Sequence, residues 1–158
     1  MKEHFSSEYL RSTLDACKLH QKWMEYAKKE LLGLSPFTAD VLRGMKEEQV
    51  SLCDQLIFRF ASLQDGMGRK LFPGMLASLA EDVEHLPFLD VQNRMEKLGL
   101  VESQRWLLLR EIRNLVAHEY PGNDTERSQG LNALLQECEY LSATLEKIHI
   151  FLLNRALI

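Results

Sequence analysis

Residues 131–152 read LNALLQECEYLSATLEKIHIFL and hold the most regular hydrophobic pattern of the chain. Apolar side chains recur three and four positions apart at Leu131, Leu134, Cys138, Leu141, Leu145, Ile148 and Leu152. This spacing puts them on one face of a long α-helix, the arrangement of a bundle or coiled-coil seam. Asp124 or Thr125 can cap the start of this helix, directly after the turn-forming stretch 121–124. The pattern therefore predicts a helical bundle.

The N-terminal region predicts another long helix, which begins after Ser6 or Ser7 and ends near Leu32. Gly33 and Pro36 follow and terminate it. Two apolar stripes run along this helix, one made of Leu10, Leu14 and Cys17 and the other of Leu19, Trp23 and Tyr26. We expect both stripes to contribute to packing.

A second long helix is expected from a cap at Thr38 to about Met67, because apolar residues recur at helical spacing throughout this range. Gly66 and Gly68 should fray its end, and Pro73-Gly74 should break the chain. Short helices are then expected over about 75–83 and over about 91–98, the latter stopped by Gly99.

A further helix should begin near Glu102, with Leu108, Ile112 and Leu115 as its buried stripe. No stretch shows the alternating pattern of a strand. The expected fold is all-α, an up-and-down bundle of long helices with short helices inserted, formed as a single domain over residues 1–158.

Composition limits the possible functions. The chain has 158 residues, 46% of them hydrophobic, and a formal net charge of −4, so binding to RNA would need a local basic cluster rather than bulk attraction. Cys17, Cys53 and Cys138 lie far apart and do not have a metal-ligand spacing, so we expect buried, reduced thiols in a cytoplasmic protein. We expect no signal peptide and no membrane-spanning segment, because no apolar run reaches about 20 residues.

The chemistry of the chain is concentrated in Arg113-Asn114-Leu115-Val116-Ala117-His118-Glu119-Tyr120, which runs into Pro121. On a straight helix, positions five apart differ by about 140° and by about 7.5 Å along the axis, so Arg113 and His118 would not share a face. Two arrangements bring both to one phosphate. Either the helix ends or distorts before His118, or two copies of the chain pair across a two-fold axis and pool their residues.

These residue types suit cleavage of RNA by its own 2′-hydroxyl. His118 can move a proton to or from the reacting oxygens near neutral pH. Arg113 matches the charge and shape of a phosphate, and Asn114 can bind a phosphate oxygen or hold the tautomer of the histidine. We expect no metal and no cofactor.

The string of Arg-Asn, three apolar residues and His-x-Tyr-Pro resembles the HEPN superfamily, and within it the HepT-type ribonuclease toxins. The stretch 58–65 (FRFASLQD) and the stretch 68–73 (GRKLFP) also resemble this family, so the similar sequence motifs cover roughly residues 55–121. The resemblance implies a homodimeric helical bundle whose paired Arg113 and His118 line a shared cleft. It further implies a minimal nucleotidyltransferase antitoxin as partner, which inactivates the enzyme by attaching AMP to Tyr120.

Other interpretations remain open. One alternative is a non-catalytic subunit that presents substrate or nucleotide to a nucleotidyltransferase, and another is a purely structural helical dimer. His118 near a helix C-terminus is also explained by the helix dipole alone. Arg59, Arg69 and Lys70 can rim an RNA cleft, although a solvated helix face explains them as well. Trp23 and Trp106 fit the core better than a base-stacking surface.

Overall fold

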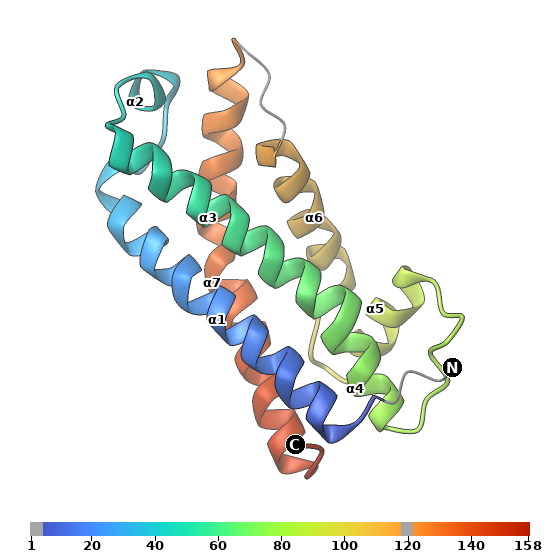
Figure 1. Cartoon of the computed structure of the whole chain (residues 1–158). Coiled ribbons are helices and arrows are strands. Elements are labelled where there is room, and N and C mark those ends of the chain that lie inside the picture. The colour runs from blue at the N-terminus through green and yellow to red at the C-terminus, as the bar shows by residue number, and fades with distance from the viewer. Residues whose placement is uncertain (1–4, 118–121) are drawn as a thin grey trace.

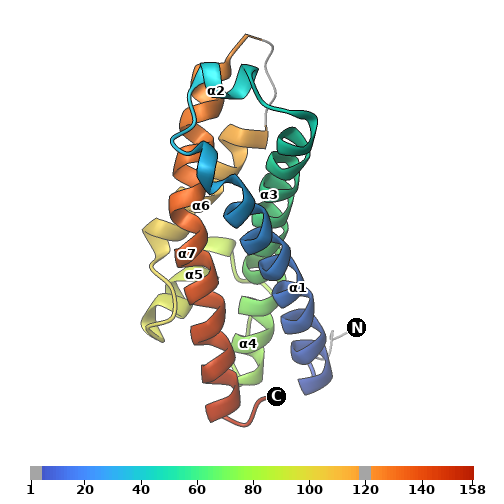
Figure 2. The same cartoon turned by 90° about the vertical axis from the view of Figure 1, so that its left-hand side faces the viewer.

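A computed structural model describes residues 5–117 and 122–158, and every regular element in these ranges is helical. The long helices are α1 (Ser7–Leu31), α3 (Glu47–Gly66), α6 (Ser103–Ala117) and α7 (Asp124–Asn154). They run alternately up and down and pack side by side (Figures 1 and 2). The prediction of an all-α up-and-down bundle is confirmed.

Short elements connect the long helices. They are the 3-10 turn η1 (Leu32–Leu34), helix α2 (Ala39–Arg43), the π-helical segment η2 (Met67–Leu71), helix α4 (Phe72–Ser78) and helix α5 (Phe88–Lys97). Helix α2 covers one end of the bundle, whereas α4 and α5 lie toward the other end (Figure 1). In the described part of the chain, no helix is both long and apolar enough to cross a membrane.

The predicted single helix from Thr38 to Met67 is wrong, because two separate helices occupy this range. Thr38 does cap a helix, since its Oγ1 accepts a hydrogen bond from the Val41 backbone N–H at 3.1 Å, but that helix is only α2. Gly44 ends α2, and the side chain of Gln49 then accepts from the Lys46 backbone N–H at 2.9 Å. Capping at both sides of this short gap outweighs the continuous apolar spacing.

The expected chain break at Pro73-Gly74 is also wrong, because helical turns continue from α3 through η2 into α4. Pro73 is the second residue of α4, directly after the π segment. Gly74 is buried against the side chains of Tyr9 and Leu10 on α1. The wide π turn, rather than a loop, redirects the chain here.

The core confirms the pattern that predicted the bundle. All seven residues of the predicted stripe on α7 are buried, with Leu131 and Leu152 both 0% exposed. On α1 the first predicted stripe is buried, but in the second Leu19 and Tyr26 are about half exposed. The three cysteines are buried free thiols, as predicted, and burial raises the pKa of Cys17 and of Cys138 to about 12.

Helix α6 is rotated relative to the prediction. Its buried side chains are Trp106, Leu109, Ile112 and Val116, whereas Leu108 and Leu115 are each 45% exposed. Both sets fit helical spacing, and Ile112 belongs to both. The Trp106 ring decides between them, because it is fully buried and its centroid lies 4.8 Å from that of Phe72.

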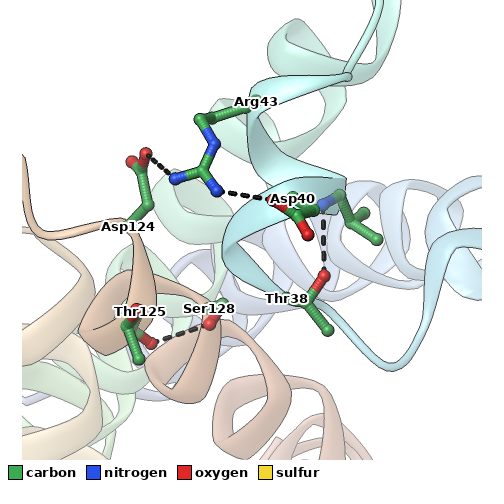
Figure 3. Close-up of polar contacts among 7 residues, drawn as sticks. Thr38, Asp40, Arg43, Asp124, Thr125 and Ser128 are labelled. Carbon is green, nitrogen blue, oxygen red and sulfur yellow. Dashed lines mark hydrogen bonds and ion pairs between the residues drawn. The ribbon is translucent and has the colours of Figure 1, made fainter.

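Helix α2 forms an ion pair with the start of helix α7. Arg43 of α2 lies 3.6 Å from the carboxylate of Asp124, the first residue of α7, and also pairs with Asp40 (Figure 3). One turn further, Ser128 Oγ donates to the Thr125 carbonyl at 2.7 Å. The start of α7 is therefore held on both the α2 side and within its own first turns.

The C-terminal part of α6 lies very close to α7 at Gly130. A Cβ built on this glycine would lie 2.7 Å from Cγ1 of Val116, which is closer than real Cβ contacts come. Gly130 is itself buried. The absence of a side chain there lets α7 support the turn of α6 that precedes His118.

Candidate functional site

The predicted site residues divide between described and undescribed parts of the chain. Arg113 and Asn114 lie on the last turns of α6. His118 and Tyr120 lie outside the described residues. Asn114 is exposed, and its Oδ1 accepts a hydrogen bond from Nη2 of Arg113 at 3.4 Å.

Arg113 does not extend freely into solvent, because its side chain is only 20% exposed. Its Nη1 lies 3.7 Å from Oδ1 of Asp65, near the end of α3. The same carboxylate oxygen lies 2.9 Å from Nε of Arg69 in η2. One carboxylate thus pairs with two guanidinium groups from different elements.

A pocket of roughly 160 Å³ opens where α3, η2, α5 and α6 meet. Among the described residues, its lining side chains include three arginines, Arg69, Arg110 and Arg113, and a single carboxylate, Asp65. The chain as a whole carries a net charge of −4, so this excess of positive charge is local. Such a cluster of guanidinium groups fits an anion, and phosphate in particular.

Two features keep this pocket open. The Cβ of any larger residue at Gly68 would lie 3.2 Å from the Phe88 ring and 3.4 Å from Nε1 of Trp106. Phe88 in turn is covered by the Arg110 guanidinium, 4.5 Å from the ring centre, so this arginine is held at the pocket wall.

Gln64 also lines the pocket and is 2% exposed. Its Oε1 is buried and has no hydrogen-bond partner among the described residues, and the same holds for Nε1 of Trp106. A buried acceptor without a partner costs stability unless something binds it. Gln64 therefore keeps an unpaired acceptor in the wall behind the pocket.

The π segment explains why these groups converge. It replaces regular α-helical turns between Gly66 and Phe72, where sequence reasoning expected frayed glycines and a break. π turns often occur at functional sites because they change the direction in which side chains point. Here the segment carries Gly68, which makes room, and Arg69, which lines the pocket.

The structure brings together residues from all three stretches that resemble the HEPN superfamily. Asp65 belongs to the stretch 58–65, Arg69 to the stretch 68–73, and Arg113 to the string that begins with it. Sequence reasoning did not assign Gln64, Asp65 or Arg110 to the site. The only available signal was the spacing of Arg110 and Arg113, which lie three apart and so share a helix face.

The comparisons with known proteins return nothing that bears on this site. No protein-family model, no curated protein and no solved structure matches the chain. Within residues 5–117 and 122–158, no three His, Cys, Asp or Glu side chains gather as metal ligands would. The functional argument therefore depends on the pocket and on the motif residues themselves.

Proposed function

We propose that this protein is an endoribonuclease of the HepT type, the toxin of a toxin–antitoxin pair. The observation that supports it is the pocket in which Arg113 meets Arg69 and Arg110 beside one carboxylate. A phosphate group of RNA fits this charge, and the partial burial of Arg113 strengthens its attraction to an anion. This local cluster of arginines can attract RNA although the chain as a whole carries a net negative charge.

The proposed reaction uses the 2′-hydroxyl of the RNA as nucleophile. Its oxygen bonds to phosphorus while the bond from phosphorus to the 5′-oxygen breaks, which yields a 2′,3′-cyclic phosphate and a 5′-hydroxyl. One proton leaves the 2′-oxygen and one reaches the 5′-oxygen, and His118 carries out one of these transfers while solvent water carries out the other. Arg113 binds the phosphate oxygens, where negative charge accumulates. DNA lacks the nucleophile and is not cleaved.

The proposal includes a homodimer. Leu107, Leu108 and Leu115 are 37%, 45% and 45% exposed, and they lie on α6, the helix that carries Arg113. These exposed leucines lie on the helix that leads into the motif, with the exposed Glu111 between them on the same face, and they suit a self-complementary contact between two copies. Pairing there would cover Leu108 and Leu115, which the sequence predicted to be buried.

The proposal also includes a protein partner, the antitoxin. In this proposal a minimal nucleotidyltransferase acts as antitoxin and attaches AMP to Tyr120. The phosphate of that group would compete with RNA for the guanidinium of Arg113, and the adenosine would obstruct the pocket.

A non-catalytic binding subunit is the second candidate, and one observation favours it. The lining of the described pocket supplies cations and an amide but no group that ordinarily titrates near pH 7. Without His118 at the phosphate, the same pocket would bind RNA or a nucleotide and leave it intact.

Cleavage of RNA by the purified chain decides between the two. Labelled RNA should be cut in the presence of EDTA, and Arg113→Ala should lower the rate by about 10²–10³-fold. Arg155→Ala is the matched control, because Arg155 is an exposed arginine at the far end of α7. Binding of RNA without cleavage by the unmodified chain would support the binding subunit and reject the nuclease.

A further inference from the structure

A second hollow lies beside the Arg113 pocket. It is an open groove of roughly 690 Å³ between α1 and the end of α3. Ser12, Ala16 and His20 line it from α1, and Ser62 and Lys70 line it from α3 and η2. Small residues on both helices leave the space unfilled, although the two helices pack closely elsewhere (Figure 1).

The groove and the pocket are neighbours. Asp65 and Arg69 line both of them, so these two side chains form the ridge that separates one from the other. A ligand that crosses Arg69 leaves the Arg113 pocket and enters the groove directly. The groove extends along α1 from Tyr9 to His20, which is about 16 Å at 1.5 Å per residue.

The groove walls carry groups that suit a sugar–phosphate chain. Within the described ranges, no ion pair engages Lys70, and no hydrogen bond engages the hydroxyls of Ser12 and Ser62. Lys70 is exposed and lines the groove together with the buried Cys17. Arg69 and Lys70 together outweigh the single carboxylate of Asp65.

His20 closes the far end of the groove. Its Nδ1 lies 3.0 Å from Nη1 of Arg59, and its ring packs edge-on against the exposed Phe58. Burial, with the nearby Arg59 charge, lowers the pKa of His20 below its ordinary value, so the ring is neutral at pH 7. This end therefore offers aromatic surface and a fixed guanidinium, the combination that proteins use against unpaired bases.

We propose that this groove binds the continuation of a single-stranded RNA whose cleaved phosphate lies in the Arg113 pocket. The strand crosses Arg69 and follows the groove, where Lys70 and the serine hydroxyls bind its backbone. The inference rests on the proposed function, because it assigns the substrate of that site: an extended, unpaired strand rather than a mononucleotide.

Binding of two oligouridylates tests this inference. Both carry 2′-O-methyl groups, which remove the nucleophile, and they are about three and about ten nucleotides long. The longer one should bind more tightly to the unmodified protein. Lys70→Ala should weaken its binding several-fold and lower the slope of log affinity against log salt by about 0.7, as expected for one lost phosphate contact. Binding of the shorter one should not change.

A second variant fills the groove without changing charge. Ala16 is exposed and lines the groove, so Ala16→Phe should also weaken binding of the longer oligonucleotide only. Lys147→Ala and Ala143→Phe are matched controls, because both residues are exposed on α7 and line neither hollow. Circular dichroism checks that all four variants keep their helical content.

The outcomes separate this inference from the proposed function. Equal affinity for both oligonucleotides, or unchanged binding in Lys70→Ala and Ala16→Phe, overturns the groove assignment even if the protein cleaves RNA. Length-dependent binding that both variants weaken supports the groove even if the protein proves to be a binding subunit without nuclease activity.

Discussion

The guanidinium of Arg113 on α6 lies 3.7 Å from the carboxylate of Asp65 on α3. This contact connects the part of the candidate site on α6 with the part on α3 and η2. Asp65 also pairs with Arg69 at 2.9 Å. A phosphate that enters the pocket must compete with this carboxylate for both arginines. Asp65 therefore orients Arg113 and at the same time opposes the binding of an anion.

Asp65→Asn should tighten binding of a 2′-O-methyl oligouridylate. The amide keeps the shape of the side chain but removes the competing charge, and exposed ion pairs of this kind contribute about 0.2–1 kcal/mol. The dissociation constant, measured by fluorescence anisotropy, should fall by up to about five-fold. Asp40→Asn is the control, because Asp40 pairs with Arg43 on α2, which covers the opposite end of the bundle from α5 (Figure 1). Weaker binding in Asp65→Asn would show that the carboxylate serves only to position the arginines.

His118→Ala should abolish most of the ribonuclease activity and leave RNA binding nearly intact. A general acid–base group typically contributes about 10²–10⁴-fold to the rate, whereas the charge that attracts the phosphate comes from the arginines. Single-turnover cleavage and anisotropy on the same preparation measure the two effects. His85→Ala is a suitable control, because His85 is exposed and lines neither hollow. Normal cleavage by His118→Ala would reject the proposed mechanism.

Much of the fold could be predicted from the sequence, because the spacing of apolar residues indicates which face of a long helix is buried. The stripe of α7 is the clearest case. The prediction failed where two different faces of a helix fit the same apolar spacing. On α6, burial of Trp106 turns Leu109 rather than Leu108 toward the core. The prediction failed also at Gly44 and at Pro73, where local capping and a π turn decided the path of the chain.

The candidate site was less predictable than the fold. Arg113 stood out because of its motif, but its partner Asp65 is 48 positions earlier in the chain, and no local pattern connects the two. The contact depends on how α3 and α6 cross and on the π segment beside them. No propensity rule places a π turn at residues 67–71, so the convergence of Gln64, Asp65 and Arg69 on Arg113 could not be derived from spacing.

The exposed leucines of α6 should mediate the homodimer. Leu108→Glu would place a carboxylate in an apolar contact and should convert the dimer to a monomer, as measured by light scattering at micromolar concentration. Leu19→Glu is the matched control, because Leu19 is 51% exposed on α1, away from the motif helix. A monomeric unmodified chain, or a dimer that persists in Leu108→Glu, would contradict this interface.

Gly130→Ala should destabilise the protein even though alanine favours helices. The added methyl group would lie 2.7 Å from Cγ1 of the buried Val116, and overpacking of this kind costs about 1–3 kcal/mol. Urea unfolding should show a lower midpoint with an unchanged slope. In Gly33→Ala, by contrast, the new methyl group meets nothing within 4 Å. Equal stability of the two variants would mean that α6 shifts away from α7 at no cost.

Tyr120 should be the residue that the antitoxin modifies. It follows His118 by two positions, and Pro121 disfavours helical geometry at Tyr120, which favours an accessible phenol close to the end of α6. In the proposed function, the phosphate of an attached AMP competes with RNA for the arginines that line the pocket, and its base obstructs the pocket. Modification should therefore lower RNA binding as well as cleavage.

Co-expression with a cognate nucleotidyltransferase, followed by intact-mass measurement and peptide mapping, tests this assignment. One or more AMP groups should map to Tyr120, and the modified protein should neither bind nor cut RNA. Tyr120→Phe should stay unmodified and toxic in the presence of the partner. Tyr140→Phe is the control and should be modified like the unmodified chain. Tyr140 lies on α7, where its hydroxyl accepts a hydrogen bond from the Glu102 backbone N–H at 3.0 Å. Inhibition without any added mass would mean that the partner blocks the pocket by binding alone. AMP on a different residue would reject Tyr120 as the switch.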